Sequence, residues 1–297
     1  MENQAFDPRG VFLRKAAGGE VLVANGAERP ADHAAAEWLR ETFPFTRPSP
    51  VLRLERTFGV GDRLGIAGDG HLRVFKKYDA VPVLAQQSMR ELKLTNRTYE
   101  DVLDCATFAV FRAGYTGPWG ADGDHLKTMD EVRLALGLGY TMITLDCSEH
   151  IRGPEGRADV PQDMRDRYVG RPFPLDDGSA VSFTQDSLSQ ALAVYGDAIS
   201  FAHRVWQEFF AGGKTTADLE ISIDETSLPT SPAQHFFAAS ELSRLGVGMK
   251  TMAPRFIGEF QKGIDYIGDV SAFDREMQVH AAIARRFGYK ISVHSGS

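Results

Sequence analysis

The segment 218–226, DLEISIDET, carries the pattern that decides the fold class. Apolar and polar side chains alternate along it: Leu219, Ile221 and Ile223 against Glu220, Ser222 and Asp224. Alternation with a period of two predicts a β-strand whose two faces meet different surroundings. A buried polar group that lacks a partner costs a few kcal/mol. The polar face of this strand is therefore expected to meet other polar groups, a ligand or a metal.

The same alternation recurs in TMITLDC (141–147) and in KISVH (290–294), where Ser292 and His294 lie opposite Ile291 and Val293. An edge strand with a solvated face would also alternate in this way. Three such strands together favour a closed barrel, in which polar side chains point inward near the mouth. A doubly wound sheet is disfavoured, because its strands are apolar on both faces.

Segments of helical length separate the expected strands. We expect strands at 61–67, 108–114, 141–147, 218–226, 248–254 and 290–294, and helices near 86–104, 128–137, 186–210, 231–245 and 271–287. Connections of this length force parallel pairing of the strands. The sequence therefore predicts an α/β fold, a TIM-like (β/α) barrel over residues 56–297, with about six strands present. Residues 1–55, with a helix near 31–43, predict a small N-terminal cap.

Composition narrows the functional classes. The chain has 297 residues, a net charge of −7 and 43% hydrophobic residues, which is typical of a globular protein and argues against a nucleic-acid or membrane-surface partner. The N-terminus lacks the apolar core of a signal peptide, and no run of 18 apolar residues occurs. Cys105 and Cys147 are too few for a disulfide framework and indicate a cytoplasmic location. The sequence leaves homo-oligomerisation open.

Carboxylates and histidines gather just after several predicted strands. They are Asp146, Glu149, His150, Asp224, Glu225 and His294. Barrel enzymes carry their working residues at these carboxyl ends. Carboxylates with imidazole suit a divalent metal such as zinc, manganese, cobalt or nickel. The alternative for a single aspartate is a helix cap or turn residue.

The remaining histidines differ in their surroundings. His125, with Lys127 beside it, lies in GADGDHLKT (120–128), which is interpreted as a loop of the kind that often carries function. His203, His235 and His280 lie on predicted helices and are interpreted as packing residues. The glycines of GVGDRLG (59–65) have the wrong spacing for a dinucleotide-binding fingerprint.

Six stretches together resemble the tagaturonate epimerase family. They are GVGDRLGIAGDGHLR (59–73), GDHLKT (123–128), TLDCSEH (144–150), ISIDETSLPTSPAQHFFAASEL (221–242), APRFIGEFQKGIDYIGD (253–269) and YKISVHSGS (289–297). The resemblance covers most of residues 55–297. It implies a metal-dependent enzyme of bacterial hexuronate breakdown that interconverts tagaturonate and fructuronate. Family chains continue beyond an HSGS motif, so the resemblance also implies that this sequence is part of a longer chain, with six of eight barrel strands.

The implied keto-hexuronate substrate suggests the chemistry. The inverted carbon is β to the ketone, which favours retro-aldol cleavage and re-addition over a transient oxidation that would need a nicotinamide. We expect metal ligands at Asp146, Asp224 and His294, and acid/base groups at Glu149, Glu225 and His150. We expect the substrate to be bound by Arg112, His125, Lys127 and Arg255.

Two other functional classes stay open. One is a class II-type metal-dependent aldolase acting on a keto-sugar acid, which would differ from an epimerase by releasing two fragments. The other is a non-catalytic barrel that binds a sugar acid, which would show no metal-dependent turnover.

Overall fold

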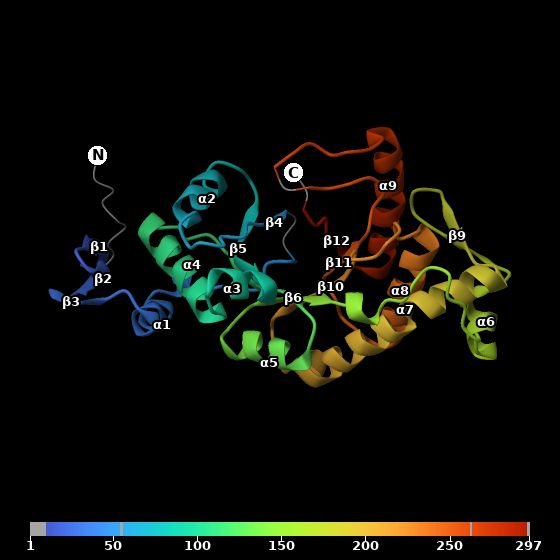
Figure 1. The fold of residues 1–297 in the computed structure, drawn as a ribbon, viewed down its shortest axis with the longest axis horizontal. Coiled ribbons are helices and arrows are strands. Elements are labelled where there is room, and N and C mark those ends of the chain that lie inside the picture. The colour runs from blue at the N-terminus through green and yellow to red at the C-terminus, as the bar shows by residue number, and fades with distance from the viewer. Residues whose placement is uncertain (1–9, 54–55, 262, 296–297) are drawn as a thin grey trace. The chain divides into compact units, whose positions relative to one another are not determined.

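The computed structural model describes residues 10–53, 56–261 and 263–295. The chain forms two compact units with a mixed α/β architecture (Figure 1). The first comprises Met1–Ile143 with Thr216–Asp218, and the second comprises Thr144–Thr215 with Leu219–Ser297. The predicted cap boundary at residue 55 falls outside the described residues. The predicted cap itself stays a prediction.

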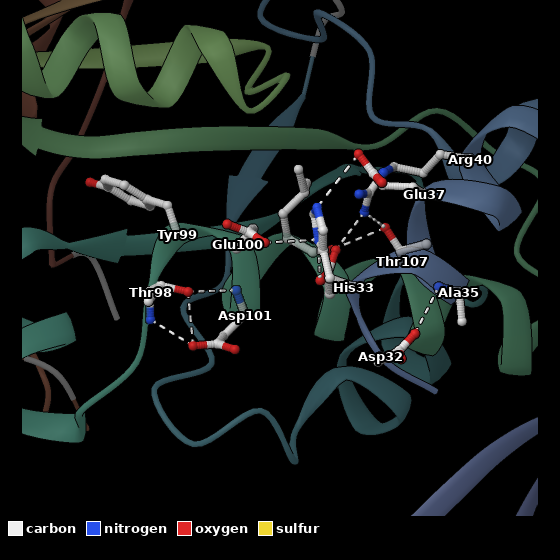
Figure 2. Close-up of polar contacts among 12 residues, drawn as sticks. Asp32, His33, Ala35, Glu37, Arg40, Thr98, Tyr99, Glu100, Asp101 and Thr107 are labelled. Atoms are coloured by element: carbon white, nitrogen blue, oxygen red, sulfur yellow. Dashed lines mark hydrogen bonds and ion pairs between the residues drawn. The ribbon is translucent and has the colours of Figure 1, made fainter. Parts of the chain in front are cut away.

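An antiparallel sheet and one helix begin the first unit. Its strands are β1 (Phe12–Ala16), β2 (Gly19–Ala24) and β3 (Ala27–Pro30), in that order, followed by α1 (His33–Thr42). The Asp32 side chain accepts a hydrogen bond of 3.0 Å from the backbone N–H of Ala35 and so caps α1 (Figure 2). The helix predicted near 31–43 is confirmed.

Helix α1 is joined to a second helix, α4 (Tyr99–Ala113), by a polar cluster. The carboxylate of Asp104 lies 2.8 Å from Nδ1 of His33 and accepts a bond of 2.8 Å from Arg40. Arg40 also donates to the hydroxyl of Thr107 at 3.1 Å (Figure 2). The hydrogen bond with Asp104 raises the pKa of His33. Charge pairing therefore supplements apolar packing between these two helices.

Three parallel strands form the sheet of the first unit. They are β4 (Thr57–Gly59), β5 (Val81–Ser88) and β6 (Gly120–Leu126), and β5 pairs with both neighbours. The other helices of the unit are α2 (Gly68–Phe75), α3 (Met89–Thr95) and α5 (Met129–Gly137). The helix predicted near 128–137 is confirmed, and Thr128 caps it. A short 3₁₀ helix covers Pro44–Thr46.

The strand predicted at 61–67 is wrong. The Asp62 carboxylate accepts hydrogen bonds from the backbone N–H groups of Ile66, Ala67 and Gly68, at 3.1, 2.7 and 3.2 Å. These bonds fold the segment into a turn that leads into α2, since a short acidic side chain competes with a sheet ladder for backbone donors. The strand lies earlier, at Thr57–Gly59.

The strand predicted at 108–114 is also wrong, because this segment is the end of α4. Thr98 and Asp101 form a capping box at its start (Figure 2), and Gly114 ends it at a φ of 54°. The helix is buried along most of its length, so its apolar residues show no single stripe. The helix predicted near 86–104 instead contains the end of β5, all of α3 and the start of α4, with a left-handed break at Asn96.

Strand β6 was interpreted as a loop because of its glycines. A Cβ on Gly120 would lie 2.8 Å from Val51, and one on Gly123 would lie 3.0 Å from Ala135. The glycines of this strand therefore serve close packing rather than a turn.

The second unit holds the better-predicted elements. Its sheet has the order β12 (Lys290–Ile291), β11 (Thr251–Pro254), β10 (Asp218–Ile223), β7 (Met142–Asp146), and β11 pairs in parallel with β10 and β12. Helices α7 (Gln185–Val205), α8 (Pro232–Arg244) and α9 (Val270–Phe287) follow, with α8 packed against both others (Figure 1). The predicted strands at 141–147, 218–226 and 248–254 and the helices near 186–210, 231–245 and 271–287 are confirmed. Of the strand predicted at 290–294 only Lys290–Ile291 forms a strand, and His294 lies in a turn after it.

A long connecting segment with short elements of its own joins β7 to α7. It contains a 3₁₀ turn (Ser148–His150), α6 (Gln162–Tyr168) and an antiparallel hairpin of β8 (Pro172–Pro174) and β9 (Ala180–Ser182). A π-helical turn (Trp206–Phe210) and a 3₁₀ turn (Ala211–Gly213) follow α7. No helix in the described parts of the chain is long and apolar enough to cross a membrane.

Both faces of β10 are buried. Its apolar residues are 1–3% exposed, and Glu220 and Ser222 on the opposite face are 2% and 1% exposed. The polar face is therefore not the solvated face of an edge strand, and its polar groups need partners inside the protein.

Two buried histidines, His235 of α8 and His280 of α9, contact each other close to the start of β12. Nδ1 of His235 lies 2.8 Å from Nδ1 of His280, and Nε2 of His235 lies 2.5 Å from the hydroxyl of Tyr289. Both rings are fully buried. Burial lowers the pKa of His280 to about 4 and that of His235 well below its usual value, where the charge of His280 adds to the effect.

Because both rings are buried in the neutral form, we expect the free energy of unfolding to fall as the pH is lowered. The folded-state pKa of His280, about 4, is below the ordinary 6.5, so the unfolded chain takes up the proton first as the pH falls. Its contribution, on the order of 3 kcal/mol, is present above pH 6.5 and is lost as the pH falls towards 4. We expect the free energy of unfolding, measured with urea at pH 7, 5.5 and 4.5, to change less with pH in His280→Asn than in the wild type. The control His203→Asn, at a half-buried position on α7, should keep the wild-type slope; an unchanged slope in His280→Asn would contradict the account.

Candidate functional site

The carboxyl ends of the strands in the second unit carry most of the predicted site residues. Asp146 ends β7, is 1% exposed and accepts a hydrogen bond of 2.8 Å from the backbone N–H of Ser148. Asp224 and Glu225 follow β10. A carboxylate oxygen of Glu225 lies within 4.8 Å of one of Asp146. The ends of β7 and β10 therefore bring acidic groups together, as the sequence predicted.

His294, which follows β12, lies between two carboxylates. Its Nδ1 is 3.1 Å from an oxygen of Asp224, and its Nε2 is 2.8 Å from an oxygen of Glu220. The hydroxyl of Ser222 donates a short hydrogen bond to Asp224 and fixes that carboxylate in turn. The structure thus brings together two of the three predicted metal ligands.

Glu220 is a site residue that the sequence reasoning missed. Its side chain is 3% exposed, and it accepts hydrogen bonds from the hydroxyls of Thr251 and Thr144 at 2.5 and 3.4 Å. Burial alone would raise its pKa, but bonds from His294 first, and then from Thr251 and Ser292, hold the pKa below its ordinary value. The signal in the sequence was its place on the polar face of DLEISIDET.

The environment of His294 favours the charged ring. Burial acts against the positive charge, but the hydrogen bonds to Asp224 and Glu220 outweigh it and raise the pKa of His294 well above its ordinary value. The site therefore has the electrostatic character of a cation-binding position: two carboxylates face one ring.

A cavity of about 260 Å³ opens beside Asp224 and His294. It is also lined by Arg255, Phe256 and Phe260, among others. Its volume is close to the lower end of the range of small-molecule sites, about 300 Å³. The lining residues include two acidic ones, Asp224 and Glu259, together with a histidine, an arginine and two phenylalanines, which suits a small, polar ligand.

The backbone of Arg255 is held in place by Thr230. The N–H of Arg255 donates to the hydroxyl of Thr230 at 3.1 Å, and the N–H of Thr230 donates to the carbonyl of Arg255 at 2.8 Å. Thr230 is fully buried and also lies 3.5 Å from the hydroxyl of Tyr195. The backbone of Arg255, a lining residue of the cavity, is therefore fixed by hydrogen bonds.

One wall of the cavity comes from the segment after β11. The backbones of Glu259 and Ile267 exchange two hydrogen bonds, at 2.9 and 3.1 Å. The hydroxyl of Tyr266 donates to the carbonyl of Ile257 at 3.0 Å, and its ring packs against Phe260. These contacts fold the segment back upon itself.

The other predicted residues of the second unit lie on the turn after β7. Glu149 is exposed, and the ring of His150 packs against that of Phe201 at a centroid distance of 4.3 Å. Their roles as acid/base groups stay predictions.

Three predicted substrate-binding residues lie in the first unit. His125, in β6, has a positive φ of 53°, and Nε2 lies 3.8 Å from the carboxylate of Asp124. The backbone N–H of Lys127 donates to Glu131 at the start of α5. The substrate-binding roles of both residues stay predictions.

Arg112 was predicted to follow a strand, and this placement is wrong, because it lies in the last turn of α4. Its guanidinium pairs with Glu20 at 2.7 Å and with Asp69 at 2.8 Å. These pairs link α4 to β2 and α2, and they explain the residue structurally. Its substrate-binding role stays a prediction.

Comparison with known proteins places the chain in a family. Residues 15–297 match the sequence model of tagaturonate epimerase. The chain belongs to the tagaturonate epimerase family. It is 39% identical to the tagaturonate/fructuronate epimerase of Thermotoga maritima, over 98% of this chain and 66% of that protein. The resemblance inferred from the sequence motifs is confirmed.

Solved structures of the tagaturonate epimerase family have the same fold as this chain. The native crystal structure of the fructuronate-tagaturonate epimerase UxaE from Cohnella laeviribosi superposes with a TM-score of 0.92 at 42% identity, covering 99% of this chain and 66% of that one. A crystal structure of the same enzyme complexed with one glycerol gives the same values. The chain thus spans slightly less than two thirds of the length of these relatives.

Two glycines in the segment after β11 allow a test of how Tyr266 packs there. Gly258 has a φ of +77°, and a Cβ there would lie 2.2 Å from the hydroxyl of Tyr266. Gly263 has a similar φ of +83° but open space around it. We expect Gly263→Ala to cost about 1 kcal/mol in unfolding free energy through backbone strain alone. Gly258→Ala should cost roughly 1–3 kcal/mol more, because the methyl group displaces Tyr266. Equal losses in urea unfolding would show that Tyr266 does not pack as described.

Proposed function

We propose that the complete protein interconverts D-tagaturonate and D-fructuronate as a metal-dependent hexuronate epimerase. Family membership supports this reaction, and the names of the relatives describe it. The observation that carries it in this chain is the cavity that gathers Asp224, Arg255 and His294. A metal-ligand pair and a cation at one cavity suit a substrate with a ketone and a carboxylate.

The residues fit a divalent metal. Asp224 and Nδ1 of His294 lie 3.1 Å apart at the cavity wall, and carboxylate with imidazole is a common ligand set for zinc, manganese, cobalt and nickel. We propose that these two residues hold the metal, with Asp146 as the third predicted ligand. A metal bound there would supply Lewis acidity to the ketone half of the substrate.

Arg255 is the proposed partner of the substrate carboxylate. Arg255 lines the cavity, and its backbone is held by Thr230. A guanidinium can bind a carboxylate through two parallel hydrogen bonds, which fixes the orientation of the sugar acid. Orientation matters because only one carbon of the substrate is to be inverted.

The proposed chemistry is retro-aldol cleavage followed by re-addition. A base takes the proton from the hydroxyl on the inverted carbon, and the C–O bond becomes an aldehyde carbonyl. The bond to the carbon next to the ketone breaks, and its electron pair forms an enediolate. The aldehyde half rotates, the same bond re-forms on the opposite face, and the new alkoxide regains the proton. No oxidant or reductant is consumed.

Glu225 is the first candidate for the base. It directly follows Asp224, and its exposed carboxylate can exchange protons with solvent. Glu149 and His150, on the turn after β7, are the other candidates. We further propose that the parallel strands belong to a TIM-like (β/α) barrel. The free thiols of Cys105 and Cys147 support a cytoplasmic location.

The activity test uses the intact protein, a divalent metal and D-tagaturonate without added nicotinamide. We expect D-fructuronate to accumulate to equilibrium, and exhaustive chelation to abolish turnover until the metal is restored. Product analysis separates the alternatives, because an aldolase would release two fragments. Activity that survives chelation, or that needs added NAD, would contradict the mechanism.

A further inference from the structure

Glu220 is a buried carboxylate outside the set of predicted ligands. It lies in the middle of β10, and its side chain is 3% exposed. An isolated buried carboxylate is costly, so a strand retains one only where the surrounding groups satisfy it. Here the partners come from three other strands or their ends: Thr144 of β7, Thr251 of β11, and Ser292 and His294 after β12.

The two oxygens of Glu220 have separate partners. The hydroxyl of Thr251 donates to Oε2 at 2.5 Å. Oε1 lies 2.8 Å from Nε2 of His294 and 3.4 Å from the hydroxyl of Thr144. The carboxylate is therefore anchored on one side by strand hydroxyls and offers its other side to the imidazole.

The other ring nitrogen of His294 faces the second carboxylate, that of Asp224. Nδ1 of His294 lies 3.1 Å from Asp224, and both residues line the cavity. Where a histidine donates one ring N–H to a carboxylate, a metal can replace the proton on the other nitrogen, and such outer partners fix the tautomer and the ring orientation.

We propose that Glu220 is the positioning residue of this site: it holds Nε2–H of His294, so that a divalent cation is bound through Nδ1 together with Asp224. Glu220 is not among the residues that line the cavity. The proposal rests on the proposed metal dependence of the site. It assigns a role to a buried residue and names the ring nitrogen that acts as ligand.

A merely structural role for Glu220 is the competing account. In that account the carboxylate ties four strand ends together, and its loss lowers stability without changing cation affinity selectively. The second unit offers a matched control, Glu241, whose side chain is 4% exposed and which accepts hydrogen bonds from Tyr168 and Arg244 away from the cavity.

The experiment measures Co²⁺ affinity of the intact protein by its visible absorption, alongside thermal unfolding, for wild type, Glu220→Gln, Glu241→Gln and His294→Ala. We expect Glu220→Gln to weaken Co²⁺ binding about 10–100-fold, since an amide is a poorer acceptor for Nε2–H. Glu241→Gln should leave Co²⁺ affinity unchanged. In the Zn²⁺-loaded wild type, ¹⁵N shifts of the histidine rings should show a zinc-bound Nδ1 and a protonated Nε2 for His294.

Each outcome has a distinct meaning. Wild-type Co²⁺ affinity in Glu220→Gln, or equal losses in both glutamine variants, overturns the positioning role. Zinc bound at Nε2 overturns the assignment of the ring nitrogen. Wild-type affinity in His294→Ala overturns the proposed metal site itself, whereas loss in His294→Ala without loss in Glu220→Gln defeats only this inference. If Glu220→Gln fails to fold, Thr251→Val removes the anchor of Oε2 and should weaken Co²⁺ binding several-fold; an unchanged affinity there also overturns the proposal.

Discussion

The buried carboxylate of Glu220 is the constraint on which the second unit depends. A charge in the middle of a strand must be met by donors, and here those donors come from β7, β11 and the segment after β12. Satisfying one group therefore fixes the relation of several strand ends. The imidazole of His294 is held as part of the same network, and its second nitrogen lies 3.1 Å from Asp224. The same hydrogen bonds bear on stability and on the proposed function, because His294, which satisfies the buried Glu220, is also a proposed metal ligand.

The unit manages its buried imidazoles in two opposite ways. His294 lies between two carboxylates, which favour the charged ring. His235 and His280 contact each other in an apolar region, and burial keeps both neutral. The difference follows from the neighbours rather than from the depth of burial, since all three rings are largely enclosed. One arrangement can bind a cation, and the other contributes packing together with sensitivity to acid.

Sequence patterns predicted the elements whose chemistry is local. The alternation in β10 predicted that strand directly, and segments of helical length between the expected strands predicted α5 and α8. Prediction was wrong at Asp62, whose carboxylate binds three nearby backbone donors in place of a sheet ladder, and at 108–114, a helix that tertiary packing buries on several sides. Within the site, strand ends revealed Asp224 and His294. The role of Glu220 could not be predicted, because it depends on which strand lies beside β10 and on where the segment after β12 places its histidine.

The most direct measurement of the central claim is anomalous diffraction from crystals of the intact protein loaded with Mn²⁺ or Zn²⁺. The account predicts one strong peak at bonding distance, about 2.0–2.2 Å, from Nδ1 of His294 and a carboxylate oxygen of Asp224. Nε2 of His294 should remain hydrogen-bonded to Glu220. A metal bound elsewhere, with the His294–Asp224 contact unchanged, would contradict the account.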